Sequence, residues 1–316
     1  MMKLKRKRSL EHVAKSVVMN TLRYLLLTGL SFIILYPLLL KLSSSFMTQE
    51  DLLDTLVVYI PRNFTLYNYK TAAEYMDYFT GLKNTFIISL LCGLVQMFIC
   101  SYIGYGLARF KFKGRGVVMA LVFFTILAPP STFQTSLYLR FRYFDFFGIG
   151  ELLTGNVANL MDSFWPLTIL SITGFAFKNG LFIFMMRQYF KNVPEELEEA
   201  AYVDGSGVFR TFFKIILPLS KSMMLTVFLF SFAWQWTDTF YTRMFFSRIK
   251  TLSNLLLKGF QGMMVPGRVL GLGNGQPLTV ALTGTLSLMV IAPLIIMYIF
   301  AQKSLTEGIE RSGIVG

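Results

Sequence analysis

Very few side chains in this chain of 316 residues could carry out catalysis. The single histidine, His12, lies in a basic segment near the beginning of the sequence. Cys92 and Cys100 are eight residues apart in one predicted helix, and the rise of about 12 Å between them excludes a mutual disulfide. The sequence contains no H-E-x-x-H zinc motif, no G-x-S-x-G serine motif and no cysteine cluster. We therefore expect no catalytic residue, no metal site and no cofactor bound by this chain.

The densest run of acidic side chains lies in residues 193–205, which read VPEELEEAAYVDG. Four glutamates follow Pro194, and both proline and acidic side chains favour the first turn of a helix, the acids because they complement its positive end. Leu197, Ala200 and Ala201 recur at helical spacing and form a narrow stripe with two small side chains. This stripe is a place where the surface of another protein could approach closely.

A turn and a second short helix are expected to follow. Asp204-Gly205 supplies the stop, because glycine adopts the left-handed conformation of a helix C-cap without strain. Two such helices joined by a glycine turn would form a rigid lever. The alternative is an amphipathic loop on the lipid surface, although anionic lipids of the inner leaflet would repel four glutamates. The second helix is predicted from the helical spacing of its apolar side chains and from the dipeptide that ends or kinks it: Phe209, Phe212, Phe213, Ile216 and Leu217-Pro218.

Lys178 is a further candidate because it lies within an apolar stretch. An ammonium group in the middle of a membrane is costly, so such a lysine faces protein, a partner group or water, and it marks a solute path. The alternative is that Lys178 lies at the end of a displaced helix and extends to the membrane surface.

The elements that must position these residues are transmembrane helices. Hydrophobic residues make up 54% of the chain and charged residues only 15%, against roughly 25% charged residues in soluble domains. A helical span needs about 20 mostly apolar residues. We therefore expect an all-α integral membrane protein with one transmembrane domain, residues 22–301. Its spans are expected at about residues 22–40, 84–108, 117–137, 164–186, 222–241 and 279–301.

Two of the predicted spans carry signals of their own. Pro129-Pro130 should kink or end the third helix, which a membrane tolerates only where protein or water satisfies the freed carbonyls. The second span carries small residues that let neighbouring helices approach closely, namely Gly93, Ser101, Gly104 and Gly106.

The net charge of +13 is interpreted as topology, since the basic residues lie between spans and form no continuous face for nucleic acid. Of the 30 lysines and arginines, 18 fall on the side of the two termini and 11 on the other side. The richer side is expected to be cytoplasmic. Residues 1–21 then form a cytoplasmic basic tail, residues 302–316 a cytoplasmic C-terminal tail, and residues 187–221 a long cytoplasmic connection.

That connection resembles the EAA loop of permease subunits of binding-protein-dependent ABC importers. The resemblance is carried by Glu199-Ala200-Ala201, Asp204-Gly205, Ile215 and Leu217-Pro218. The residues around it are similar to the carbohydrate-uptake, maltose-permease-like branch. The similar segments are Asn84-Thr85, Tyr105 to Arg109, Arg187 to Phe190, Pro194 to Leu197, Trp234 to Asp238, and Gln302-Lys303 through Gly308 to Gly316.

The resemblance implies a type I ABC importer permease fold in the plasma membrane of a prokaryote, with the loop lying in a cleft of a separate cytoplasmic ATPase dimer. ATP and Mg²⁺ would be bound by that ATPase, in agreement with the lack of a G-x-x-x-x-G-K-[ST] phosphate loop in this chain. A second homologous permease, forming a heterodimer, and an extracytoplasmic solute-binding protein are also implied. The expected ATPase-coupling residues are Glu198, Glu199, Ala200, Ala201, Asp204, Gly205, Leu217 and Pro218.

The implied solute is a sugar or an oligosaccharide. Amide and carboxylate groups pair with sugar hydroxyls, and aromatic faces cover the apolar face of a sugar. The tryptophans could instead be interfacial anchors, and Asp238 could instead pair with Lys178 or Arg243 in a structural bridge. The expected substrate-path residues are Trp234, Gln235, Trp236, Asp238 and Lys178.

The alternative function is an ion-coupled secondary transporter of a polar solute. Such a carrier is expected to show several intramembrane carboxylates or an internal inverted repeat. Only Asp238 lies near a predicted span, and the sequence shows no repeat.

Overall fold

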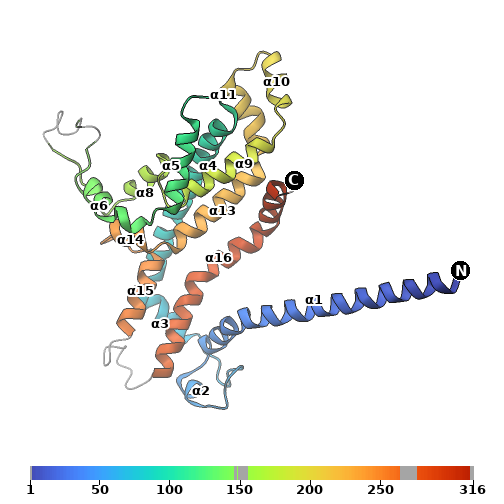
Figure 1. Cartoon of the computed structure of the whole chain (residues 1–316). Helices are drawn as coiled ribbons and strands as arrows, with labels where there is room; N and C mark the ends of the chain where they lie inside the picture. Colours follow the sequence, from blue (N-terminus) through green and yellow to red (C-terminus); the bar gives the residue numbers. More distant parts are fainter. Residues whose placement is uncertain (1, 146–147, 149–155, 264–275, 314–316) are drawn as a thin grey trace. The chain divides into compact units, whose positions relative to one another are not determined.

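The computed structural model describes residues 2–145, 148, 156–263 and 276–313, and these ranges form helices joined by turns, with two isolated β-bridges (Figure 1). The chain divides into two compact units. The first unit comprises residues 1–74 and 262–289, and the second comprises residues 75–261 and 290–316. The all-helical prediction is confirmed within the described ranges.

Three helices are long and apolar enough to cross a membrane: Lys15–Ser45, Tyr78–Arg109 and Ala281–Lys303. Two sharply bent helix pairs would bring the count to five if each pair formed one span. The six spans therefore stay a prediction.

The first unit is built on α1 (Met2–Ser45), which continues through Pro37 and past the predicted end of the span at residue 40. Short helices follow, α2 (Gln49–Leu53) and the start of α3 (Tyr67–Met76). The Asn68 amide is buried and donates to the carbonyl oxygens of Ser45 at 3.0 Å and Met47 at 2.9 Å. This side chain replaces the helical hydrogen bonds that the chain loses where α1 ends.

The second unit is organised around α4 (Tyr78–Arg109), which packs along α9 (Asn179–Asn192) and α13 (Lys221–Thr237) (Figure 1). A Cβ at Gly104 would lie 2.7 Å from the Met186 Cβ, so only glycine fits at this crossing. A Cβ at Gly93 would lie 3.1 Å from the Phe228 ring, which is also a tight contact, whereas a Cβ at Gly106 would meet nothing nearer than 3.9 Å. The predicted close approach is confirmed at Gly93 and Gly104 and is wrong at Gly106.

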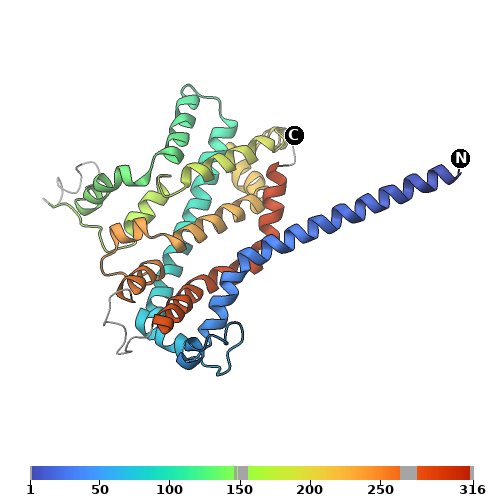
Figure 2. The same ribbon diagram turned by 60° about the horizontal axis from the view of Figure 1, so that its bottom comes forward.

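The double proline ends a helix, as predicted. α5 (Arg115–Leu127) stops just before Pro129, and the chain then enters the 3₁₀ turn η1 (Pro130–Phe133) and α6 (Gln134–Arg142). The bend between the two arms is 100° (Figure 2). Residues 117–137 therefore form a broken element and not a straight span.

The predicted span at residues 164–186 is also broken. It consists of α8 (Trp165–Ile172) and α9, separated by residues 173–178. Gly174 has φ +79° and Lys178 has φ +68°, and neither value continues a right-handed helix. Lys178 occupies the N-cap position of α9, so it lies at the end of a helix, as in the alternative given for it, and not within a continuous span.

The fifth predicted span, residues 222–241, ends early. α13 stops at Thr237, and α14 (Phe240–Phe245) and α15 (Leu252–Met263) follow. The prediction for residues 279–301 lies within α16 (Gln276–Gly313), and residues 314–316 of the predicted C-terminal tail lie outside the described residues.

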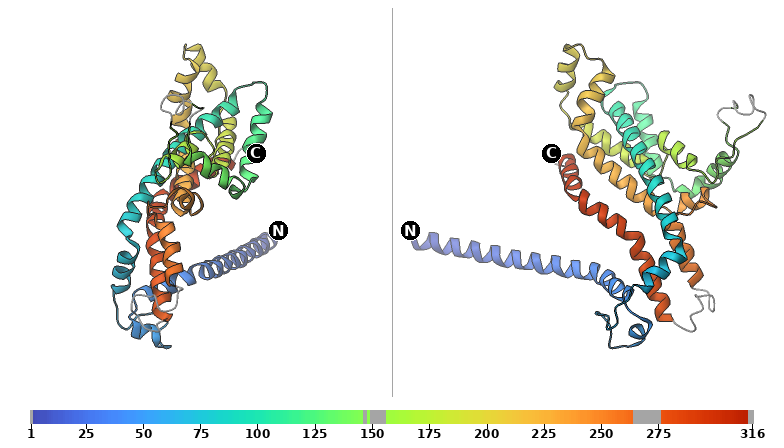
Figure 3. Two further views of the ribbon diagram at one scale, coloured as in Figure 1. Left: turned by 90° about the vertical axis from the view of Figure 1, so that its left-hand side faces the viewer. Right: turned by 180° about the vertical axis from the view of Figure 1, so that it is seen from behind.

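The long connection between α9 and α13 folds as the two predicted short helices (Figure 3). The first is α10 (Glu196–Val203), which begins two residues after Pro194 and not at it. The second is α11 (Val208–Thr211), which widens into the π-helical turn η2 (Phe212–Ile216) and ends as α12 (Leu217–Leu219). A bend of 76° then leads into α13, which confirms the kink predicted at Leu217-Pro218.

Candidate functional site

The end of α10 is fixed by its glycine. Gly205 has φ +78°, its N–H donates to the Tyr202 carbonyl at 3.0 Å, and the Ser206 N–H donates to the Ala201 carbonyl at 2.9 Å. These two bonds form a complete Schellman motif, which satisfies carbonyls that the helix end leaves free. The predicted C-cap is confirmed.

The residues of α10 divide between an inward and an outward face. Glu198 and Ala201 are buried, whereas Glu199, Ala200, Asp204 and Gly205 are exposed. The predicted stripe is therefore split, because Ala201 faces the protein while Leu197 and Ala200 face away from it. Glu198, at 6% exposure, cannot offer its carboxylate to another protein in this conformation.

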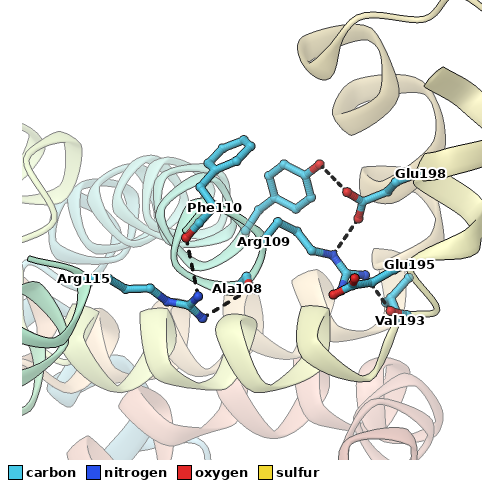
Figure 4. A network of polar contacts seen from close by, with 8 residues as sticks. Ala108, Arg109, Phe110, Arg115, Val193, Glu195 and Glu198 are labelled. Carbon is cyan, nitrogen blue, oxygen red and sulfur yellow. Dashed lines mark hydrogen bonds and ion pairs between the residues drawn. The ribbon is translucent and has the colours of Figure 1, made fainter. Parts of the chain in front are cut away.

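Figure 4 shows the polar contacts of Glu198. Its two carboxylate oxygens accept from the Arg109 Nε at 2.6 Å and from the Tyr105 hydroxyl at 3.0 Å. A second branch of the Arg109 guanidinium donates to the Val193 carbonyl at 2.5 Å, and a third lies 3.4 Å from the Glu195 carboxylate. Arg109 and Tyr105 belong to the last turns of α4, so that helix end holds the connection of residues 187–221, which is named the coupling segment after the role that the resemblance implies.

The same end of α4 is held by two further arginines. Arg115 donates to the carbonyls of Ala108 and Phe110, and Arg187 donates to the carbonyl of Leu107 (Figure 4 shows the Arg115 bonds). Cations at a helix C-terminus complement its dipole and its free carbonyls. The positive charge of Arg187, with burial and Arg115 adding to it, lowers the pKa of Lys191.

The second short helix also has two faces. Phe212 and Ile216 are buried in the core beside Tyr105, whereas Phe209 and Phe213 are 65% and 55% exposed. Leu217 is half-buried and Pro218 is exposed. The apolar stripe predicted from spacing thus supplies packing on one side and an open aromatic surface on the other.

Lys178 lies on an aromatic cluster of the second unit. Its Nζ is 4.8 Å from the centre of the Phe177 ring and 5.6 Å from that of Trp234, within the range of cation–π contacts. Trp234 itself stacks on Phe182 at 5.5 Å. None of the ion pairs in the described ranges includes Lys178. Of the five predicted path residues, Lys178 and Trp234 are therefore brought together.

The other three predicted path residues have different surroundings. Trp236 is 1% exposed and donates to the Val290 carbonyl at 3.0 Å, so its ring is held in helix packing in this structure. The Asp238 carboxylate accepts the backbone N–H groups of Phe240, Tyr241 and Thr242 and caps α14. The proposed bridges from Asp238 to Lys178 or Arg243 are absent from the described residues. Gln235 is buried, and within those residues its Nε2 has no hydrogen-bond partner.

Arg109 and Tyr105 are the residues of the site whose roles the sequence did not reveal. Both lie in a segment that carries the family resemblance, but their partner Glu198 is 89 residues or more away along the chain. The sequence offered only opposite charges as a signal for this pairing. Arg109 ends a predicted span, and Glu198 lies on a connection expected on the same side of the membrane.

Several transport proteins are similar to this chain in sequence. The chain is 29% identical over 295 residues to the maltodextrin transport system permease protein MdxG of Bacillus subtilis, covering 93% of this chain and 95% of that protein. It is 30% identical over 295 residues to the maltodextrin permease MalD of Streptococcus pneumoniae, with the same coverage. It is 26% identical over 310 residues to the polygalacturonan/rhamnogalacturonan permease YtcP of Bacillus subtilis, covering 96% of this chain and all of that protein.

A solved structure supports the fold. A bacterial ABC transporter involved in the import of the acidic polysaccharide alginate superimposes with a TM-score of 0.72 and 23% identity, covering 90% of this chain and 96% of that one. Residues 78–305, which include α4, the coupling segment and α13, match the family of binding-protein-dependent transport system inner membrane components. This match excludes the ion-coupled alternative. The chain belongs to that family and is a membrane-embedded permease subunit of an ABC importer.

Proposed function

We propose that this permease forms half of a path for a sugar or oligosaccharide and is driven by a separate cytoplasmic ATPase dimer that binds ATP and Mg²⁺. A second homologous permease, as a heterodimer, would complete the path, and an extracytoplasmic binding protein would deliver the solute. The observation that carries the proposal is that Glu199 and Ala200 on α10, and Asp204 and Gly205 just beyond its end, are all exposed. The names of the maltodextrin permeases support a carbohydrate as the solute.

The proposed mechanism transmits motion through α10. Closure of the ATPase pair around ATP displaces α10, and the helices then change from an inward-facing to an outward-facing arrangement. The two arrangements must differ in their contacts with nucleotide or solute, since otherwise neither ligand could shift the balance between them. Both termini, residues 1–21 and 302–316, would lie in the cytoplasm of a prokaryotic cell.

Lys178 favours one class of carbohydrate. Its ammonium lies on the Phe177 and Trp234 rings and belongs to no ion pair in the described ranges. A sugar ring that carries a carboxylate could pair with this ammonium while its apolar face covers an aromatic ring. An oligosaccharide containing uronate residues is therefore proposed over a neutral one, in line with the polygalacturonan named for one relative.

Affinity purification of this chain from its native membrane tests the proposal. An ATPase and a second permease should co-purify, and the purified complex should hydrolyse ATP. Glu199→Lys should leave the complex assembled but uncouple ATP turnover from uptake, because it reverses one exposed charge of α10. Glu50→Lys, a charge reversal at an exposed site on α2, is the control. Recovery of the chain without an ATPase, or wild-type uptake by the Glu199→Lys importer, would contradict the proposal.

A further inference from the structure

Arg109 occupies an unusual position for an arginine at the end of a membrane helix. Its side chain is only 7% exposed, and that of its partner Glu198 is 8% exposed. Most arginines at such positions extend into water or towards lipid head groups. Here the guanidinium turns inward. Its three nitrogens donate to the Glu198 carboxylate on α10 and, just before α10, to the Val193 carbonyl and the Glu195 carboxylate.

In the ion pair of Arg109 and Glu198, both carboxylate oxygens have a hydrogen-bond donor. The Glu198 carboxylate receives one hydrogen bond on each oxygen, from Arg109 and from the Tyr105 hydroxyl. Tyr105 is 2% exposed and lies against the Phe212 ring, with ring centres 4.7 Å apart. One buried group of side chains therefore joins the end of α4 to α10 and to the second short helix. A buried pair of charges is costly to form and strongly destabilising to break from one side only.

Backbone contacts could not hold α10 in this way. α10 has only eight residues, and isolated helices of that length are marginal in water. Its outward face is exposed, and of its inward side chains only Glu198 and Ala201 are buried. The end of α4 reaches α10 and the residues before it through side chains, and of these hydrogen bonds Arg109 donates three and Tyr105 one.

We propose that Arg109 is the positioning residue of the coupling segment, fixing α10 to the end of α4 so that the two move as one body when the ATPase acts. This inference rests on the proposed function, because it assigns the residue through which α10 passes its motion into the membrane. Arg109 does so without touching solute or nucleotide. Lysine could not replace it fully, since one ammonium cannot span Glu198 and the Val193 carbonyl in the planar geometry of a guanidinium.

The first experiment measures the attachment directly. Spin labels are placed on cysteines introduced at Gly207, just beyond α10, and at Lys113, just beyond α4; both sites are exposed, and native Cys92 and Cys100 are buried. The wild-type importer should give one narrow distance distribution with and without ATP. Arg109→Met should broaden it, Arg109→Lys should give an intermediate width, and Glu198→Gln, which preserves shape, should also broaden it.

The second experiment measures coupling in the reconstituted importer. Arg109→Met and Glu198→Gln should lower the amount of solute taken up per ATP hydrolysed by roughly tenfold while the ATPase stays bound. Lys111→Met removes an exposed cation two residues from Arg109 and should leave the ratio unchanged. Glu198→Gln keeps the proposal testable if Arg109→Met does not assemble.

Distributions as narrow in both variants as in the wild type, or uptake per ATP within twofold of it, would overturn the inference. The distance measurement distinguishes failure of this inference from failure of the proposed function. The width of the distribution reports whether α10 is fixed to α4, whether or not the ATPase drives uptake of a sugar.

Discussion

At the scale of single residues, two glycines of the coupling segment, separated only by Ser206, differ in backbone conformation. Gly205 has φ +78°, whereas Gly207 has φ −76°, and a Cβ would meet nothing within 4 Å at either position. Space is therefore equal at the two sites, and only the backbone conformation separates them. A side chain is strained at Gly205 and not at Gly207.

Gly205→Ala should destabilise the end of α10 by about 1 kcal/mol, which raises local opening roughly fivefold. Gly207→Ala is the matched control and should have no such effect. Hydrogen exchange of the α10 amides in the assembled importer measures the opening. Equal exchange in the two variants would show that the left-handed cap does not hold the helix end.

Lys178 provides the second comparison at this scale. If its ammonium pairs with a sugar carboxylate, the importer should bind trigalacturonate about tenfold more tightly than the neutral methyl ester of the same trisaccharide. Lys178→Arg should keep that preference, and Lys178→Met should abolish it. Equilibrium binding to the purified importer without its binding protein measures all three. A preference that survives in Lys178→Met would place the anion elsewhere.

Features that depend on neighbouring residues in the sequence were predictable, and contacts between residues far apart in the sequence were not. The C-cap at Gly205 and the break at Pro129-Pro130 depend on local backbone preferences, which the sequence displays directly. Lys178 adopts a left-handed conformation that its residue type does not favour, so local preference alone does not predict it. The pairing of Arg109 with Glu198 needs the folded arrangement of helices far apart in sequence.

At the scale of the elements, the crossing of α4 and α9 is held at a distance that only glycine allows. A Cβ at Gly104 would lie 2.7 Å from the Met186 Cβ and 3.0 Å from the backbone nitrogen of Arg187. The second neighbour is backbone and cannot rotate away. The two helices would have to separate, and Arg187 would move with its bond to the α4 carboxyl end.

Gly104→Ala should therefore cost about 1 to 3 kcal/mol and lower the unfolding temperature of the permease in detergent. Gly106→Ala, on the same helix, should be neutral or stabilising, because its nearest neighbour would be 3.9 Å away and alanine favours helix. Thermal unfolding of the two variants checks this difference. A Gly104→Ala protein as stable as Gly106→Ala would show that α4 and α9 can move apart freely.

Polar contacts inside the helix bundle add specificity to this packing. The Gln96 amide of α4 donates to the Ser171 hydroxyl at 3.3 Å and accepts from the Ser231 hydroxyl at 2.8 Å. These bonds join α4 to α8 and to α13. Spacing within one predicted helix cannot indicate such a network, since each partner lies on a different element.

At the scale of the whole molecule, the chain belongs to a family of transport components and offers no motif for binding ATP. Its described residues also show no group of three or more potential metal-ligating side chains among histidine, cysteine, aspartate and glutamate. The composition, with 54% hydrophobic and 15% charged residues, and the apolar stretches of about 20 residues together predicted an all-helical membrane protein. The exact number of crossings could not be predicted in the same way, since two of the predicted spans are interrupted by breaks.

The widened turn η2 has a consequence for how the coupling segment is aligned with the membrane helix that follows. A π-helical turn contains one residue more than the α-helix needs, and each residue of an α-helix turns the chain by about 100°. Deleting one residue between Phe212 and Ile216 would restore a regular winding and rotate α11, with its exposed Phe209, by roughly that angle against α13. The extra residue in η2 thus sets the rotation of α11 about its own axis relative to α13.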